Sequence, residues 1–80
     1  MPKIQKLFGQ AVRRRRERLK ISQEAFASQA GVHRTYMSAI ELGKVQVSIG
    51  IAFQLAQALD MPLSKLWLDV EKQLEAADET

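Results

Sequence analysis

Apolar residues recur three or four positions apart along most of the chain, which is the spacing of one face of an α-helix. No stretch alternates apolar and polar residues as a half-buried strand would. A first helix is predicted over about residues 3–19. Its apolar positions are Ile4, Phe8, Ala11, Val12 and Leu19. Arg15 interrupts this stripe, and its aliphatic stem is expected to run along the edge of the core.

Two short helices are predicted next, on either side of a tight turn at Gly31. Ser22 can accept a hydrogen bond from the free amides that open the second helix, and Gly31 can adopt the left-handed conformation that ends it. The third helix is predicted from Arg34 to Leu42, followed by Gly43. The residues expected to be buried in this region are Phe26, Ala27, Ala30, Val32, Met37 and Ile40.

Two further helices complete the predicted fold. Ser48 is suited to cap the fourth helix, and Pro62 fits the first position of the fifth. The inward positions are expected to be Ile49, Ala52, Phe53, Ala56 and Leu59 in the fourth helix, and Leu63, Leu66, Trp67, Val70 and Leu74 in the fifth. We therefore predict an all-α, compact five-helix bundle that forms one domain over residues 1–80.

Charge is distributed unevenly, although the net charge is only +3. Residues 1–47 carry ten Lys and Arg against three acids, a net of +7, and residues 48–80 carry two against six, a net of −4. Five of the six residues from Arg13 to Arg18 are arginines. Such a basic half suits a nucleic acid, an acidic lipid surface or an acidic protein, and it can also be no more than a solvated helix face.

The composition excludes several classes of function. The absence of cysteine rules out disulfides, thiol nucleophiles and cysteine-ligated metals, and a single histidine, His33, argues against a metal site. The sequence contains neither a plausible nucleophile–base pair nor a phosphate-binding glycine loop. It has no apolar run near the roughly 18 residues of a membrane span and no export signal. We predict a cytoplasmic, non-enzymatic protein without metal, cofactor or membrane partner.

The segment from Gln23 to Leu42 carries the most specific pattern. Two short helices can cross tightly when the first has a small residue, the turn has a glycine, and the second has apolar anchors. Ala27, Gly31, Val32, Met37 and Ile40 provide these features in the required order. This spacing predicts a helix-turn-helix, whose second helix enters the major groove of DNA.

A wider set of motifs resembles the Cro/repressor helix-turn-helix family. The matching motifs are Phe8-Gly9, Val12-Arg13, Ile21-Ser22-Gln23-Glu24, Ala30-Gly31-Val32, Ile40-Glu41, Gly43-Lys44, Ser48, Leu55-Ala56, Ala58-Leu59 and Leu63-Ser64-Lys65-Leu66. The resemblance covers roughly residues 7–67 and implies a lambda-repressor-like fold. The run from His33 to Ser38 is further similar to the controller proteins of restriction–modification systems, which are short dimeric regulators.

The resemblance implies DNA contacts from the second and third helices. Gln23 matches a position that binds a phosphate, and the N-terminus of a helix also favours an anion. Arg34 and Thr35 match the exposed first turn of the recognition helix, where an arginine can donate two hydrogen bonds to guanine. Tyr36 can either bind a phosphate through its hydroxyl or pack over the helix pair. The remaining DNA-binding candidates are Ser22, Ser38, Lys44 and Gln46.

Two further expectations concern the structure of the protein rather than its contacts with DNA. The family commonly pairs the positions of Arg16 and Glu41, which implies a structural ion pair between the first helix and the end of the third. The last helix is apolar beyond what a small core needs, so residues 63–75 are predicted to be a dimerisation helix as well. Its predicted interface residues are Leu63, Leu66, Trp67, Val70 and Leu74.

We therefore interpret the chain as a sequence-specific, dimeric transcriptional regulator. The more specific hypothesis is that it is the controller protein of a restriction–modification system. The expected partners are double-stranded DNA with a palindromic operator, a second copy of the chain, and RNA polymerase. Two recognition helices one helical turn apart, about 34 Å, would read such a palindrome. The alternatives are a phage-type repressor, the antitoxin of a toxin–antitoxin pair, and a protein-interaction module on the same scaffold.

Overall fold

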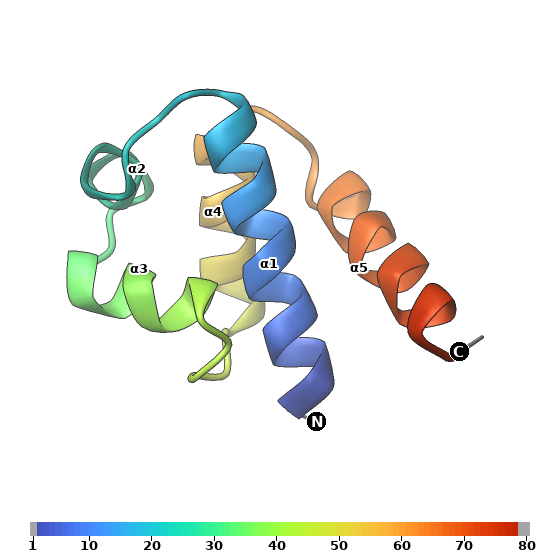
Figure 1. Cartoon of the computed structure of the whole chain (residues 1–80). Helices are drawn as coiled ribbons and strands as arrows, with labels where there is room; N and C mark the ends of the chain where they lie inside the picture. Colours follow the sequence, from blue (N-terminus) through green and yellow to red (C-terminus); the bar gives the residue numbers. More distant parts are fainter. Residues whose placement is uncertain (1, 79–80) are drawn as a thin grey trace.

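Five helices follow one another in the part of the chain that the computed structural model describes, residues 2–78. They are α1 (Pro2–Arg18), α2 (Gln23–Ala30), α3 (Arg34–Glu41), α4 (Ile49–Ala58) and α5 (Leu63–Asp78). Figure 1 shows α1 and α4 between the α2–α3 pair on one side and α5 on the other. The all-α, five-helix fold predicted from the helical spacing is confirmed.

Local signals in the sequence set several of the helix ends. The hydroxyl oxygens of Ser22 and Ser48 accept hydrogen bonds from the backbone nitrogens of Ala25 and Ile51, at 3.0 and 3.1 Å. Gly31 ends α2 with a φ of +73°, a left-handed conformation that glycine adopts without strain. These three predicted caps are confirmed, because each one satisfies backbone groups that its helix cannot pair internally.

Two helix boundaries differ from the sequence prediction. α3 ends at Glu41, one residue before the predicted Leu42. Pro62 precedes α5 instead of occupying its first position, and its carbonyl oxygen accepts hydrogen bonds from the backbone nitrogens of Lys65 and Leu66. Proline therefore occupies the capping position here, where its carbonyl is needed and its missing N–H is not.

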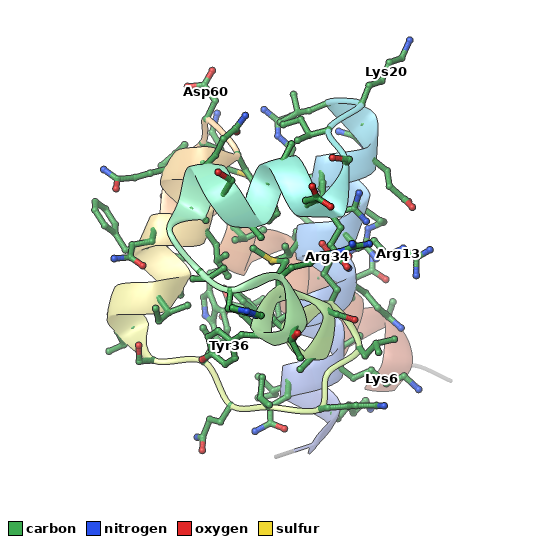
Figure 2. The ribbon with its side chains drawn as sticks, turned by 90° about the vertical axis from the view of Figure 1, so that its left-hand side faces the viewer. Lys6, Arg13, Lys20, Arg34, Tyr36 and Asp60 are labelled. Carbon is green, nitrogen blue, oxygen red and sulfur yellow. The ribbon has the colours of Figure 1, made fainter. Side chains whose placement is uncertain are left out.

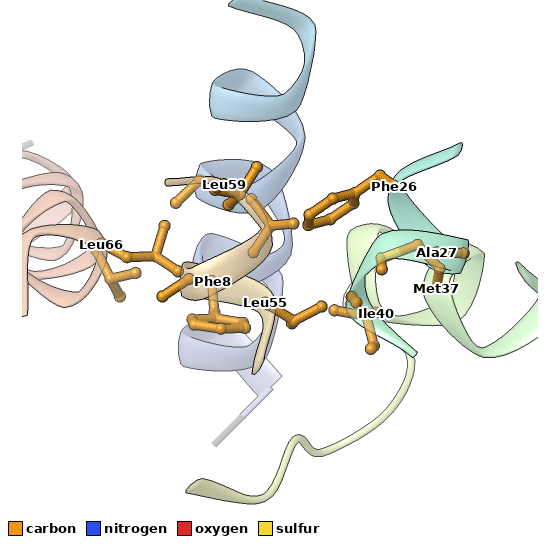
Figure 3. Close-up of a cluster of buried hydrophobic side chains, with 13 residues drawn as sticks. Phe8, Phe26, Ala27, Met37, Ile40, Leu55, Leu59 and Leu66 are labelled. Atoms are coloured by element: carbon orange, nitrogen blue, oxygen red, sulfur yellow. The ribbon is translucent and has the colours of Figure 1, made fainter. Parts of the chain in front are cut away.

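The core draws side chains from every one of these helices. Figure 3 shows Phe8 of α1, Phe26 of α2 and Ile40 of α3 converging on Leu55 of α4 and Leu66 of α5. The largest fully buried side chains are Val12, Phe26, Met37, Ile40, Leu55, Leu59, Leu66 and Val70. Each helix thus buries one apolar face against its neighbours, which is what the spacing of apolar positions requires of an amphipathic helix.

The buried face of α4 agrees only in part with the predicted one. Ala56 and Leu59 are buried as predicted and Ala52 is partly buried, but Ile49 is 84% exposed and Phe53 is 52% exposed. Leu55, which was not predicted, is fully buried, and its spacing from Leu59 is equally helical, so the spacing alone did not identify it. The packing of α4 against both α2 and α5 selects the face that carries Leu55.

One smaller expectation about burial was also wrong, and a second holds only in part. Leu19 is exposed, because α1 ends at Arg18 and the chain turns towards α2. Val32 is only partly buried, since it lies in the turn between α2 and α3. Arg15 behaves as expected of an arginine at the core edge: its Nε donates to the carbonyl oxygen of Leu59 at 3.4 Å.

Candidate nucleic-acid interface

α2 and α3 are joined by only three residues and pack directly against each other. Met37 and Ile40 anchor one face of α3 in the core, and both are almost completely buried. Arg34 and Thr35, in the first turn of the same helix, are exposed. Figure 2 views this pair with the N-terminal end of α3 towards the reader, and Arg34 and Tyr36 lie on different sides of that end. α3 is therefore anchored in the core along one face, while the side chains of its first turn are exposed to solvent.

His33 caps α3. Its Nδ1 accepts a hydrogen bond from the backbone nitrogen of Thr35 at 3.1 Å. The cap fixes the backbone of the first turn while the side chain of Thr35 stays exposed.

Arg34 is held by an acidic residue of the neighbouring helix. Its Nη1 donates to Oε2 of Glu24, in the first turn of α2, at 3.3 Å. The side chains of Arg34 and Glu24 are 62% and 76% exposed, so solvent surrounds the pair. This contact could not be predicted from the sequence, because the two residues are ten positions apart and no local pattern connects them.

Gln23, at the first position of α2, joins a buried polar cluster. Its Nε2 donates to Oε1 of Glu41 at 3.1 Å. Arg16 donates to the same carboxylate twice, from Nε at 2.7 Å and from Nη2 at 3.0 Å, so the predicted partners do meet in the structure. Arg16 also donates from Nη1 to the carbonyl oxygen of Ile21 at 2.9 Å.

This cluster fixes the start of α2 relative to α1 and the end of α3. The hydrogen bond to Glu41 raises the pKa of the Arg16 guanidinium above its ordinary value, with burial opposing and the charge of Glu41 adding to the rise. A glutamine amide carries two N–H donors. Gln23 can therefore keep its bond to Glu41 and offer its second N–H to an anion at the N-terminus of α2.

The other DNA-binding candidates divide by burial. Tyr36 is partly buried and packs against the core. Ser38 is partly buried on α3. Ser22 is exposed, and its oxygen serves the cap of α2. Lys44 and Gln46 are exposed on the loop between α3 and α4.

The arginines of α1 do not all lie beside the α2–α3 pair. Arg14 donates from Nη2 to Oδ2 of Asp69 at 3.0 Å, which ties it to α5 instead. Arg13 forms an exposed pair with Glu17, one helical turn further along α1. In Figure 2, Arg13 lies to the same side of the α2–α3 pair as Lys6 and Lys20. Basic side chains of this N-terminal region thus lie along one side of the α2–α3 pair.

The predicted dimerisation residues also separate into two groups. Leu66 and Val70 are each only 1% exposed in the core of their own chain, so they offer almost no surface to a partner. Trp67 is exposed, and Leu63 and Leu74 are partly buried. Trp67 and Leu63 line an apolar groove of about 340 Å³ together with Ile4, Phe8, Val47 and Ile49. The neighbouring Leu68 and Phe53 are exposed as well.

The described residues offer little to a metal or a buried polar ligand. Within residues 2–78, no group of His, Cys, Asp or Glu side chains is arranged to hold a metal ion. Every buried side-chain nitrogen or oxygen in that part of the chain has a hydrogen-bond partner. None of the helices described has the length and apolar character needed to cross a membrane.

Comparisons with known proteins agree with this geometry. Residues 12–66 match the helix-turn-helix family. The chain is 40% identical over 67 residues to the control protein C.MunI from Mycoplasma sp, and the alignment covers 82% of this chain and 90% of that protein.

Solved structures show the same relationship. The restriction–modification controller protein C.AhdI from Aeromonas hydrophila is similar with a TM-score of 0.74 and 36% identity, over 76% of this chain and 92% of its own. The clp gene regulator ClgR from Corynebacterium glutamicum shares the lambda-repressor-like fold, with a TM-score of 0.86 and 23% identity over 95% of this chain and 83% of its own. The chain therefore belongs to the helix-turn-helix family, as a non-enzymatic DNA-binding regulator that resembles restriction–modification controller proteins.

Proposed function

We propose that this chain is a sequence-specific, homodimeric transcriptional regulator of the controller-protein type, which acts in the cytoplasm on a palindromic operator. The observation that carries the proposal is the exposed start of α3, with Arg34 and Thr35 open to solvent while Met37 and Ile40 anchor the same helix. Reading base edges in the major groove requires such a helix, rigid on one face and free on the other. Occupancy of an operator beside a promoter would block or recruit RNA polymerase.

Each proposed contact has a distinct chemical role. Arg34 donates to O6 and N7 of a guanine, and Thr35 contacts a thymine methyl or a polar base edge. Gln23 and the N-terminus of α2 bind a phosphate. The supporting candidates are Ser22, Ser38 and Tyr36 on the helix pair, and Lys44 and Gln46 on the following loop.

Selection of bound duplexes from a random pool tests the proposal directly. A two-fold symmetric consensus, together with an affinity that falls steeply as salt rises, is the expected outcome. The salt dependence arises because cations condensed on the phosphates are released when the protein binds. Recovery of no consensus would contradict the proposal and favour a protein-interaction role for the scaffold.

Replacing Arg34 with alanine is expected to weaken binding to the selected duplex by about 1–3 kcal/mol and to relax the preference at one base position. The exposed Lys44 offers a matched comparison, because the proposed contact of its side chain is to a phosphate. Lys44→Ala should weaken binding to all sequences alike, since a phosphate carries no sequence information. Fluorescence anisotropy with duplexes substituted at single positions measures both effects. An unchanged base preference in Arg34→Ala would remove this arginine from the reading surface.

The proposed dimer surface is centred on exposed apolar side chains of α4 and α5. Ile49 and Trp67 line the groove described above, and Phe53 and Leu68 are exposed on the same two helices. Exposed apolar groups of this size on a domain with so small a core favour association with a second copy. Leu63 and Trp67 belong to this surface, whereas Leu66 and Val70 are buried beneath it in the core of their own chain.

Replacing Ile49 with aspartate is expected to shift the chain from dimer to monomer. The side chain is 84% exposed, so the substitution spares the core while it places a charge in the proposed interface. Sedimentation at tens of micromolar should show twice the 9.0 kDa chain mass for the unmodified protein and the single mass for the variant. Leu19→Asp, at the far end of α1 from the groove, should remain dimeric. An unmodified protein that sediments only as a 9.0 kDa species would contradict the dimer itself.

A further inference from the structure

The contact between Glu24 and Arg34 is unusual in its position rather than in its strength. It joins the first turn of α2 to the first residue of α3, the two places where the proposed function puts a phosphate and a base edge. Both side chains are mostly exposed, and an ion pair in such surroundings adds little to the stability of a fold. The effect of Glu24 is therefore expected on the orientation of Arg34 and on the binding of DNA, and not on stability.

One consequence of the contact is geometric. The guanidinium has five N–H donors, and Glu24 is within hydrogen-bond distance of Nη1. The remaining donors can still present two parallel N–H groups to O6 and N7 of a guanine. A free arginine side chain samples many rotamers, so a partner that restricts it before binding reduces the entropy lost when it docks.

The second consequence is electrostatic. Glu24 follows Gln23 directly, so its carboxylate lies close to the proposed phosphate site at the start of α2. A negative charge there repels the backbone of any duplex, whatever its sequence. That repulsion is offset only where Arg34 stays between the carboxylate and the DNA. Binding proteins commonly obtain specificity by combining attraction to the correct target with repulsion of incorrect ones, here DNA with and without the guanine bound by Arg34.

We propose that Glu24 is a specificity-determining positioning residue, which aims Arg34 at its guanine and penalises binding to DNA that lacks this base. The proposal rests on the DNA-reading function proposed above. It assigns Glu24 no contact with a base, and it predicts that an acidic residue opposes overall affinity while it improves discrimination.

Glu24→Gln is the variant that tests this role, with Glu17→Gln as its matched control. Glu17 also forms an exposed ion pair with an arginine, Arg13, at 3.1 Å, but both members of that pair lie on α1. The probes are the duplex consensus selected from a random pool and a scrambled duplex of the same length and composition. A third duplex replaces the guanine whose recognition depends on Arg34.

Glu24→Gln is expected to bind the scrambled duplex about two- to fivefold more tightly, and to lose about two- to fivefold of its preference for that guanine. Glu17→Gln should leave the guanine preference unchanged. In an Arg34→Ala background, Glu24→Gln should cause no further loss of preference, because Glu24 acts through Arg34. A guanine preference that is unchanged in Glu24→Gln, or that falls further in the double variant, would overturn the role of Glu24. If the unmodified protein selects no consensus, the proposed function itself fails, so the two failures are distinguishable.

Discussion

Replacing Glu41 with alanine is expected to lower the free energy of unfolding by about 3–5 kcal/mol, the usual cost of removing one member of a buried ion pair. The side chains of Arg16 and Glu41 are only 11% and 3% exposed. Three donors converge on the carboxylate: Nε and Nη2 of Arg16 and Nε2 of Gln23. In the variant they lose their acceptor in a place that water reaches poorly.

The charge of Arg16 makes the loss severe. A buried carboxylic acid can become neutral by taking up a proton, but the pKa of arginine is too high for the guanidinium to lose one near neutral pH. In the folded protein, the hydrogen bond to Glu41 raises the pKa of Arg16 further. A group whose folded-state pKa is raised stabilises the fold fully below its unfolded-state pKa and loses that contribution only as the pH rises through the folded-state value. The contribution of Arg16 is therefore complete at neutral pH and disappears only in strongly alkaline solution.

Urea denaturation of Glu41→Ala beside Glu17→Ala isolates this effect. Both substitutions remove a glutamate from a helix and both break a pair with an arginine, but the Arg13–Glu17 pair is more than half exposed. Glu17→Ala should change the free energy of unfolding by less than about 1 kcal/mol. Equal shifts in the two variants would mean that the Arg16–Glu41 pair is not a structural element of the fold.

The parts of the fold that the sequence could predict depend on short-range chemistry. The hydroxyls of Ser22 and Ser48 accept hydrogen bonds from backbone N–H groups at the start of their own helices, and Gly31 adopts the left-handed conformation that ends α2. Each of these effects involves only residues that are close in sequence. In α1, the stripe through Phe8, Ala11 and Val12 is also buried as predicted. Arg15 shows that one polar residue in such a stripe need not break the pattern.

The errors arise where two helix faces satisfied the same spacing. In α4, Ile49 and Phe53 on one side and Leu55 on the other are both at helical spacing from the buried Ala56 and Leu59, and only the packing against α2 and α5 distinguishes them. In α5, the sequence did not separate Leu66 and Val70, which close the core of their own chain, from Trp67, which remains exposed. Tertiary context decides both cases, and it is not encoded within a single helix.

The candidate site was predictable in its position but not in its internal contacts. The spacing around Gly31 located the helix pair, and the exposed residues Arg34 and Thr35 lie at the start of α3. The bonds from Arg34 to Glu24 and from Gln23 to Glu41 join residues ten and eighteen positions apart. Such contacts depend on how α2 lies relative to α3, so they became visible only in three dimensions.

Replacing Gly9 with alanine is expected to destabilise the fold by about 3 kcal/mol or more, at or above the upper end of what overpacking usually costs. Gly9 lies in α1 where the end of α3 crosses it. A methyl group there would overlap with the carbonyl oxygen of Ile40, and it would lie 2.7 Å from the carbonyl oxygen of Glu41 and 2.9 Å from its carbonyl carbon. All of these are backbone atoms, so no side chain can rotate away and the two helices must move apart.

Gly50→Ala is the matched control for Gly9→Ala, because it makes the same change in the exposed first turn of α4. A methyl group at Gly50 would find only the hydroxyl oxygen of Ser48, at 4.0 Å. Gly50→Ala should therefore raise the free energy of unfolding, by about 0.4–1 kcal/mol, since it restricts only the unfolded chain. Opposite shifts of the thermal midpoints would show that the two glycines have opposite roles. A stabilised Gly9→Ala variant would mean that α1 and α3 do not approach this closely. Because a methyl group at Gly9 would meet the backbone of Glu41, the replacement is also expected to disturb the ion pair of Glu41 with Arg16 and its hydrogen bond from Gln23.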